Sequence, residues 1–125
     1  MAFILEQSPT FTYPLVFREV QDGGRIRSHE FVAVYRRLSQ SRMEEVQLAY
    51  QAIKVAAQRG EPIEAIPTRA IADEILDGWE KITTPDGAAV EVTAEAKARF
   101  LEVPGMADLL VSAYFEAHDK ARSKN

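Results

Sequence analysis

The stretch over residues 71–92 constrains the fold most, because it specifies a helix, a tight turn and a return strand in close succession. Ile71, Ile75 and Leu76 are spaced i, i+4 and i+5, which places them on one side of a short helix. Gly78 follows at a position where a helix C-terminus favours a residue that tolerates the left-handed region. We therefore expect the helix to end at Gly78.

The segment Thr-Pro-Asp-Gly at residues 84–87 predicts the turn, since proline presets φ and Asp-Gly suits positions where φ becomes positive. Val90 and Val92 alternate on the return strand, so the sequence predicts a second short hairpin. Trp79, the only tryptophan, lies between the helix and this hairpin, where it can bury a large apolar area. We interpret it as a core residue; the alternative is a ligand-stacking tryptophan.

The front of the chain shows the two-residue alternation of a half-buried strand. Its apolar positions are Phe11, Tyr13, Leu15 and Phe17. Pro14 lies within this run and has no backbone N–H to donate, so we expect a strand that is bulged or lies at the sheet edge. Asp-Gly-Gly at residues 22–24 then predicts a hairpin turn.

The return strand is expected over about residues 25–38 and is apolar on both faces. Phe31, Ala33 and Tyr35 share one face, and Val32 and Val34 share the other. Such a strand is either buried centrally or covered by another subunit or a client. A helix over residues 31–38 is the competing interpretation.

A long helix follows, for which Ser41 and Glu44 match a capping box and Gly60 provides the end. Its apolar stripe consists of Met43, Val46, Ala49, Tyr50, Ile53 and Ala57. Residues 61–67 are expected to form a loop, the one plausible hinge. This segment is too short and too apolar for a flexible interdomain linker.

Two further helices complete the chain. Thr93 can cap the first, which runs to about residue 102 before a Val-Pro-Gly break at 103–105. Its inward residues are Ala96, Phe100 and Leu101, and the stripe of the last helix is Met106, Leu109, Leu110, Ala113, Tyr114 and Ala117. The sequence thus predicts one α+β domain over residues 1–125, β-rich over 1–38 and α-rich over 39–125. It combines an N-terminal β-hairpin or small antiparallel sheet with a helical C-terminal part that carries the second hairpin.

The composition narrows the class of protein. A chain of 125 residues with 46% hydrophobic and 27% charged residues is ordinary for one globular domain. The net charge of −4 argues against nucleic acid as a partner. The lack of cysteine excludes thiol chemistry and fits a reducing compartment. No apolar run is long enough to span a membrane, and the start lacks a signal peptide's basic region, so we expect a cytoplasmic protein.

Motifs for catalysis are missing from the sequence. His29 and His118 are far apart and each is followed by a carboxylate, so we interpret both as exposed side chains rather than metal ligands. The carboxylates Asp73, Glu74 and Asp77 are interpreted as a solvated face of the short helix. With no phosphate loop and no nucleophile elbow, we predict no catalytic, cofactor-binding or metal-binding residues and no enzyme. A pocket with a perturbed carboxylate would favour an enzyme instead.

The order of the motifs resembles that of tail assembly chaperones of tailed phages. In the front half, the resemblance rests on the segment Phe-Val-Ala-Val-Tyr-Arg-Arg-Leu at residues 31–38, which follows the Gly-Gly turn. In the back half, the resemblance rests on the order of five features: Ile-Leu-Asp-Gly-Trp at 75–79, a Pro-Asp-Gly turn, a capped helix, a Val-Pro break and a final helix with Ala113-Tyr114. The resemblance covers roughly residues 11–118.

The resemblance implies a non-enzymatic protein of the host cell cytoplasm that is absent from the mature virion. Family members bind the long, largely helical tape measure protein before the tail tube forms around it. Many have a longer, frameshifted form that recruits the major tail protein. We therefore expect a tape measure partner, and the same reading predicts a homo-oligomer and no cofactor, nucleic acid or membrane partner.

We assign partner contact to Val32, Val34, Arg36 and Arg37. The two arginines can pair with acidic positions on a client helix or a neighbouring subunit, or can form a solvated strand end. The alternative function is a structural tail completion or head–tail connector protein of the virion. An acidic regulatory or antitoxin-like protein is a third possibility, although no basic recognition helix is present.

Overall fold

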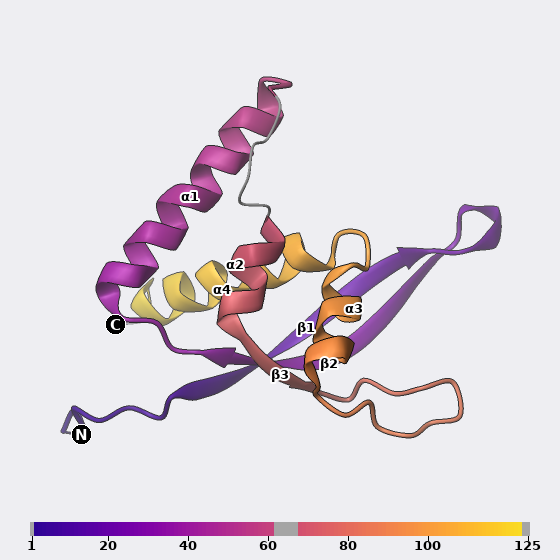
Figure 1. Cartoon of the computed structure of the whole chain (residues 1–125), viewed down its shortest axis with the longest axis horizontal. Helices are drawn as coiled ribbons and strands as arrows, with labels where there is room; N and C mark the ends of the chain where they lie inside the picture. Colours follow the sequence, from indigo (N-terminus) through magenta and orange to yellow (C-terminus); the bar gives the residue numbers. More distant parts are fainter. Residues whose placement is uncertain (1, 62–67, 124–125) are drawn as a thin grey trace.

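The computed structural model describes residues 2–61 and 68–123, and it confirms the α+β class. Figure 1 shows a three-stranded sheet with a long protruding hairpin and with helices packed over one face. The strands are β1 (Thr10–Val20), β2 (Ile26–Arg36) and β3 (Leu76–Glu80). The helices are α1 (Gln40–Gln58), α2 (Thr68–Ile75), α3 (Ala94–Leu101) and α4 (Met106–Ser123), and a 3-10 turn spans Asp22–Gly24.

The sheet is antiparallel in the order β1-β2-β3. The edge position predicted for the strand with Pro14 is confirmed, since β1 pairs with β2 alone. Residues 31–36 belong to β2, so the strand interpretation is correct and the helical one is wrong. The turn between β1 and β2 depends on its glycines, because Gly23 and Gly24 have φ values of 73° and 77°.

The predicted alternation decides which face of the hairpin is buried. In β2, Phe31, Ala33 and Tyr35 are buried, whereas Val32 and Val34 are only partly buried. In β1, the apolar positions that were predicted to face inward pack against the same core: Phe11, Tyr13, Leu15 and Phe17. The helices cover this inner face.

Hydrogen bonds from two tyrosine side chains connect α4 to β2. The Tyr35 hydroxyl donates to the Leu110 carbonyl (2.7 Å), and the Tyr114 hydroxyl donates to the Arg36 carbonyl (2.8 Å). Their ring centroids are 5.1 Å apart, and neither residue is accessible to solvent. The stripe predicted for the last helix is confirmed, with Val111 as an additional buried residue.

The prediction for Gly78 is wrong. Helix α2 ends at Ile75 and the chain enters β3 directly, where Gly78 pairs with Val34. A β-bulge between Val34 and Tyr35 allows both Leu76 and Trp79 to reach the core. Pairing with β2 satisfies backbone groups that a helix end would leave free.

Close packing explains why residue 78 is glycine. A Cβ atom at Gly78 would lie 3.2 Å from Cγ2 of Val92. The absence of a side chain therefore lets Val92 lie against the backbone of β3.

The second hairpin forms around the predicted turn, but it is shorter than expected. The Gly87 N–H donates to the Thr84 carbonyl (2.9 Å), and the strand pairing is a single bridge between Thr83 and Ala89. Trp79 is a core residue as predicted. Its Nε1 donates to the Val90 carbonyl (3.0 Å), and its ring lies 5.1 Å from that of Phe100.

The cap of α1 differs from the prediction. The helix begins at Gln40, and its N-cap is Ser39, whose Oγ accepts from the Arg42 N–H (3.2 Å). Ser41 therefore lies inside the first turn. Both serines carry a hydroxyl suited to capping. Because β2 ends at Arg36, the chain can begin the helix at Gln40, and Ser39 then occupies the N-cap position.

The remaining helix signals are confirmed in most details. Thr93 caps α3 by accepting from the Ala96 N–H (3.0 Å), and Gly105 (φ 84°) lies between α3 and α4. In α1, the predicted stripe is buried or partly buried except for Ala57, which is exposed. Of the predicted loop at 61–67, residues 62–67 lie outside the described residues.

Replacing Ser39 with alanine removes the acceptor at the start of α1, so we expect the free energy of unfolding to fall by about 1 kcal/mol. Ser41→Ala is the matched control, and we expect a change within roughly 0.5 kcal/mol. Urea unfolding of the two variants and the parent chain measures both effects. Equal losses in the two variants would contradict the assignment of the cap.

Candidate partner-binding surface

The outer face of the β1–β2 hairpin carries an apolar surface that the helices leave uncovered. We call this surface the open sheet face and define it by Pro14, Val16, Val20, Ile26, Val32 and Val34. The register brings its members together, since Pro14 is opposite Val32 and Val20 is opposite Ile26. Val16, Val20 and Ile26 are exposed, and Val32 and Val34 are partly buried.

The predicted contact residues divide between the two faces. Val32, Val34 and Arg36 alternate along β2 and therefore point to the open side. The Arg37 guanidinium instead lies 5.0 Å from the ring centroid of Phe11, an inner-face residue, and is a cation–π partner. The structure thus groups three of the four predicted residues on one surface.

Arg36 is not simply a solvated strand end. Its Nε lies 3.2 Å from Oδ1 of Asp77 in β3, and both side chains are about half exposed. This ion pair connects β3 to β2 at the boundary of the open sheet face. Because an exposed ion pair contributes little, the guanidinium remains able to exchange Asp77 for another carboxylate.

Sequence reasoning did not assign four members of the open sheet face to partner contact: Pro14, Val16, Val20 and Ile26. Val16 was recognisable, since it is out of phase with the inward-facing Leu15 and Phe17. Val20 and Ile26 flank the hairpin turn, where the pairing of the strands determines that they meet.

The carboxylates Asp73, Glu74 and Asp77 are exposed or partly exposed, as the sequence suggested, but they are not merely solvated. Each pairs with a cation from another element: Asp73 with Lys97, Glu74 with Arg42, and Asp77 with Arg36. Asp77 moreover lies in β3 rather than in the helix. The cluster connects α2 and β3 to α1, β2 and α3.

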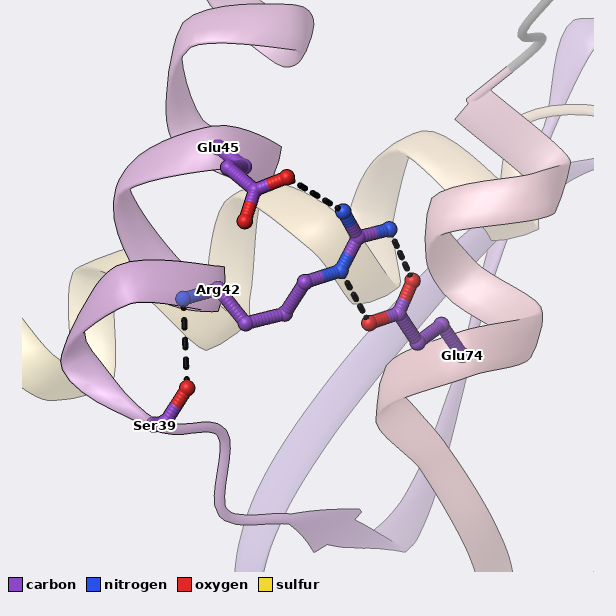
Figure 2. Close-up of polar contacts among 4 residues, drawn as sticks. All are labelled: Ser39, Arg42, Glu45 and Glu74. Atoms are coloured by element: carbon purple, nitrogen blue, oxygen red, sulfur yellow. Dashed lines mark hydrogen bonds and ion pairs between the residues drawn. The ribbon is translucent and has the colours of Figure 1, made fainter.

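Figure 2 shows the strongest of these connections, between α1 and α2. The Arg42 guanidinium donates through Nε and Nη2 to the two carboxylate oxygens of Glu74, both at 2.6 Å, and through Nη1 to Glu45 (3.2 Å). Hydrogen bonding to Arg42 lowers the pKa of the Glu74 carboxyl, and hydrogen bonding to Glu74 raises the pKa of Arg42. This bidentate geometry keeps Arg42 and Glu74 charged and paired, so neither side chain is arranged as a general acid or base.

A depression lies between α1 and α4, and we call it the α1–α4 groove. It has a volume of about 750 Å³. Its apolar and aromatic lining residues are Tyr50, Val55 and Phe115, and its polar ones include Gln51, Ser112 and Glu116. The Tyr50 hydroxyl donates to Asp108 (2.7 Å), so this side chain is held in position.

The two histidines have different environments. His29 is partly exposed, and its Nε2 lies 3.3 Å from Oε1 of Glu19 on the neighbouring strand. His118, which the sequence suggested to be exposed and satisfied, packs against Phe11 and Tyr114 with ring-centroid distances of 5.4 and 4.7 Å. Its Nε2 is buried and has no hydrogen-bond partner among the described residues.

Burial is the main cause that lowers the pKa of His118, and the cations Arg122 and Arg37 act in the same direction, while Asp119 opposes them. The folded chain therefore favours the neutral imidazole. At residues 2–61 and 68–123, no group of three or more His, Asp or Glu side chains is arranged to hold a metal ion. Nor is any helix in this part of the chain long and apolar enough to cross a membrane.

Comparisons with protein-family models, with curated proteins and with solved structures find no match for this chain.

We expect acid to destabilise the fold through His118. At pH 7 the imidazole is neutral in both states; below pH 6.5 the unfolded chain binds a proton that the folded chain resists. The stability is thus fully present above about pH 6.5 and is lost as the pH falls through the lower folded pKa. His118→Phe is expected to flatten the pH dependence of urea unfolding between pH 7.5 and 5.5.

His29→Gln is the matched control for this experiment, because it removes the other histidine without touching the buried site. This variant should keep the parent's slope of stability against pH. If the two variants flatten the profile equally, His118 is not the responsible group.

Proposed function

We propose that this protein is a non-enzymatic tail assembly chaperone of a tailed phage, which binds the tape measure protein and keeps it soluble in the host cell cytoplasm. On this proposal it leaves before the virion is complete. The observation that carries the proposal is the open sheet face, because an apolar surface in water needs a partner. The ordered motifs over residues 11–118 supply the identity of that partner.

The dimensions of the open sheet face suit a helical client. β1 and β2 each contain 11 residues, so the hairpin is roughly 35 Å long at about 3.3 Å per residue. A helix rises 1.5 Å per residue, so about 23 residues of a client helix match this length. The apolar stripe of an amphipathic helix can then lie along the strands, as helices do on sheets within domains.

Charged residues limit how strongly and where the client binds. Arg18 and Glu30 interrupt the apolar positions on the same face, and Arg36 lies at its end. These groups oppose non-specific stacking of two sheets and favour a helix with carboxylates near its apolar stripe. Arg37, which stacks on Phe11, is not expected to contribute.

The test is co-expression of this chain with the tape measure protein encoded beside it. We expect the client to become soluble and to co-purify. In the double variant Val32→Thr, Val34→Thr, two hydroxyls replace methyl groups on the open sheet face while the β-branched shape is kept. We expect co-purification to weaken by about tenfold, which corresponds to roughly 1.4 kcal/mol of binding.

Leu48→Glu on α1 is the control, since Leu48 is an exposed apolar residue remote from the sheet. It should leave co-purification unchanged. A client that stays insoluble with the parent chain would refute the proposal. Mass spectrometry of purified particles separates the alternative, because a connector or completion protein remains in the virion.

A further inference from the structure

We propose that the edge of β2 at residues 26–30 binds an extended peptide of a partner protein as an added strand. The peptide carries a large apolar side chain and, two residues later, a carboxylate. This inference goes beyond the proposed function, because it involves neither the open sheet face nor a helical client. It rests on unpaired backbone groups, on the early end of β3, and on a cavity and unpaired cations beside the same residues.

The direction of the backbone groups in β2 follows from a hydrogen bond just beyond its end. The Arg37 N–H donates to the Pro9 carbonyl (2.9 Å), so odd-numbered residues of the second strand bond to β1. Even-numbered residues of β2 therefore point their N–H and carbonyl groups toward the side of β3. On that side, β3 pairs with Val32 and Val34 and reaches no further toward the hairpin turn.

Ser28 and Glu30 are consequently left with unpaired backbone groups on this edge. Within residues 2–61 and 68–123, no backbone hydrogen bond engages these groups. Such an edge can bind a further strand, because an extended peptide presents complementary N–H and carbonyl groups at the same spacing. An α-helix cannot do so, since its backbone groups bond to one another. The edge therefore selects an extended main chain as its occupant.

The strand β3 ends early because the chain turns away after Glu80. Lys81 has a φ of 65°, in the left-handed region that residues other than glycine rarely adopt. The Ile82 carbonyl then accepts from the Val90 N–H (2.9 Å), so this segment bonds to the second hairpin rather than to β2. In the register of β3, Ile82 would be opposite Glu30 if the strand continued. We assign that place along β2 to the peptide.

The long hairpin also exposes the outer edge of β1, but this edge is less suited to a further strand. Pro14 interrupts it, and a proline on an edge strand opposes strand addition because it has no N–H to donate. In Figure 1 the hairpin of β1 and β2 extends well beyond the end of β3. The stretch of β2 over residues 26–30 contains no proline, so its edge is uninterrupted.

A cavity of about 490 Å³ adjoins the same stretch of β2, and its lining includes Ser28 and Glu30. The rings of Phe31 and Phe100 meet edge to face there, with centroids 5.5 Å apart. An added strand places every second side chain on the inner face of the sheet, and the one opposite His29 lies at this cavity. The cavity therefore suits a large apolar side chain. Its apolar lining residues are Phe17, Phe31, Ile82, Phe100, Val103 and Met106.

Two cations at the cavity, Arg27 and Lys81, have no ion-pair partner in the described part of the chain. The carboxylate of Glu19 lies 3.3 Å from Nε2 of His29, and alternation directs the Glu30 side chain to the outer face. A peptide residue opposite Arg27 lies on the inner face, two positions after the apolar one. A carboxylate at this position is complementary to the unpaired cations.

The experiment uses an amidated pentapeptide of this pattern, Thr-Phe-Thr-Asp-Thr, with a fluorophore at its N-terminus. Antiparallel pairing places its first threonine opposite Glu30, its phenylalanine opposite His29 and its aspartate opposite Arg27. We expect saturable binding to the full chain, measured by fluorescence anisotropy. If no saturable binding occurs up to about 1 mM peptide or chain, the proposal is overturned.

Two methylated peptides separate strand addition from simple filling of the cavity. The N–H of the central threonine faces β2, so methylation of this nitrogen should weaken binding by about tenfold or more. The N–H of the aspartate faces away from β2, so methylation there should change binding by less than about twofold. Equal losses for the two peptides would mean that the backbone does not pair with the edge.

On the protein, Ser28→Pro removes an N–H from the open edge without removing a hydrogen bond to β1. It should weaken peptide binding by about tenfold. Thr12→Pro is the matched control, because it removes an N–H from the outer edge of β1 in the same phase as Pro14. This variant should bind like the parent, and circular dichroism establishes that both variants fold. A folded Ser28→Pro chain that binds like the parent refutes the proposed edge.

A charge exchange tests the assignment of the carboxylate. Arg27→Glu should weaken binding of the aspartate peptide by about tenfold, and it should bind the peptide with lysine in place of aspartate better than the parent does. Arg25→Glu is the control, since Arg25 does not line the cavity, and it should leave binding unchanged. Equal effects of the two variants would show only a general attraction to the cationic hairpin, which contradicts the proposed pairing.

Discussion

The reciprocal hydrogen bonding of Tyr35 and Tyr114 is the constraint on which the arrangement of this protein depends. Each hydroxyl crosses from one element to a backbone carbonyl of the other, between β2 and α4. A buried hydroxyl without a partner is costly, so the helix has one position along the strand in which both are satisfied. Burial also raises the pKa of both hydroxyls and keeps them as donors. With α4 fixed in this way on the inner face, α2 and α3 pack beside it, and the outer face of the hairpin remains open.

The features that the sequence predicted correctly are those that local periodicity determines. Alternation placed Phe31 and Tyr35 inside and Val32 outside, and a 3.6-residue stripe identified α4. Gly78 could not be placed, because a glycine after a short helix fits both a C-cap and a strand. Its role depends on pairing with Val34 and on Val92, which are distant in the sequence. The choice between Ser39 and Ser41 depended similarly on where β2 ends.

The candidate surface was predictable in part for the same reason. Val32, Val34 and Arg36 follow from alternation. Arg37 has the phase of the inward Phe31 and Tyr35, so alternation also indicates the inner face on which it contacts Phe11. The pairing of Asp77 with Arg36 and the packing of His118 against Phe11 arise from contacts between elements remote in sequence, so residue spacing could not reveal them. The α1–α4 groove likewise exists only once two helices from the two ends of the helical part are brought together.

The α1–α4 groove and the open sheet face lie on different sides of the sheet, because α4, which forms one wall of the groove, packs on the inner face and the open sheet face is the outer one. Occupying one therefore does not block the other.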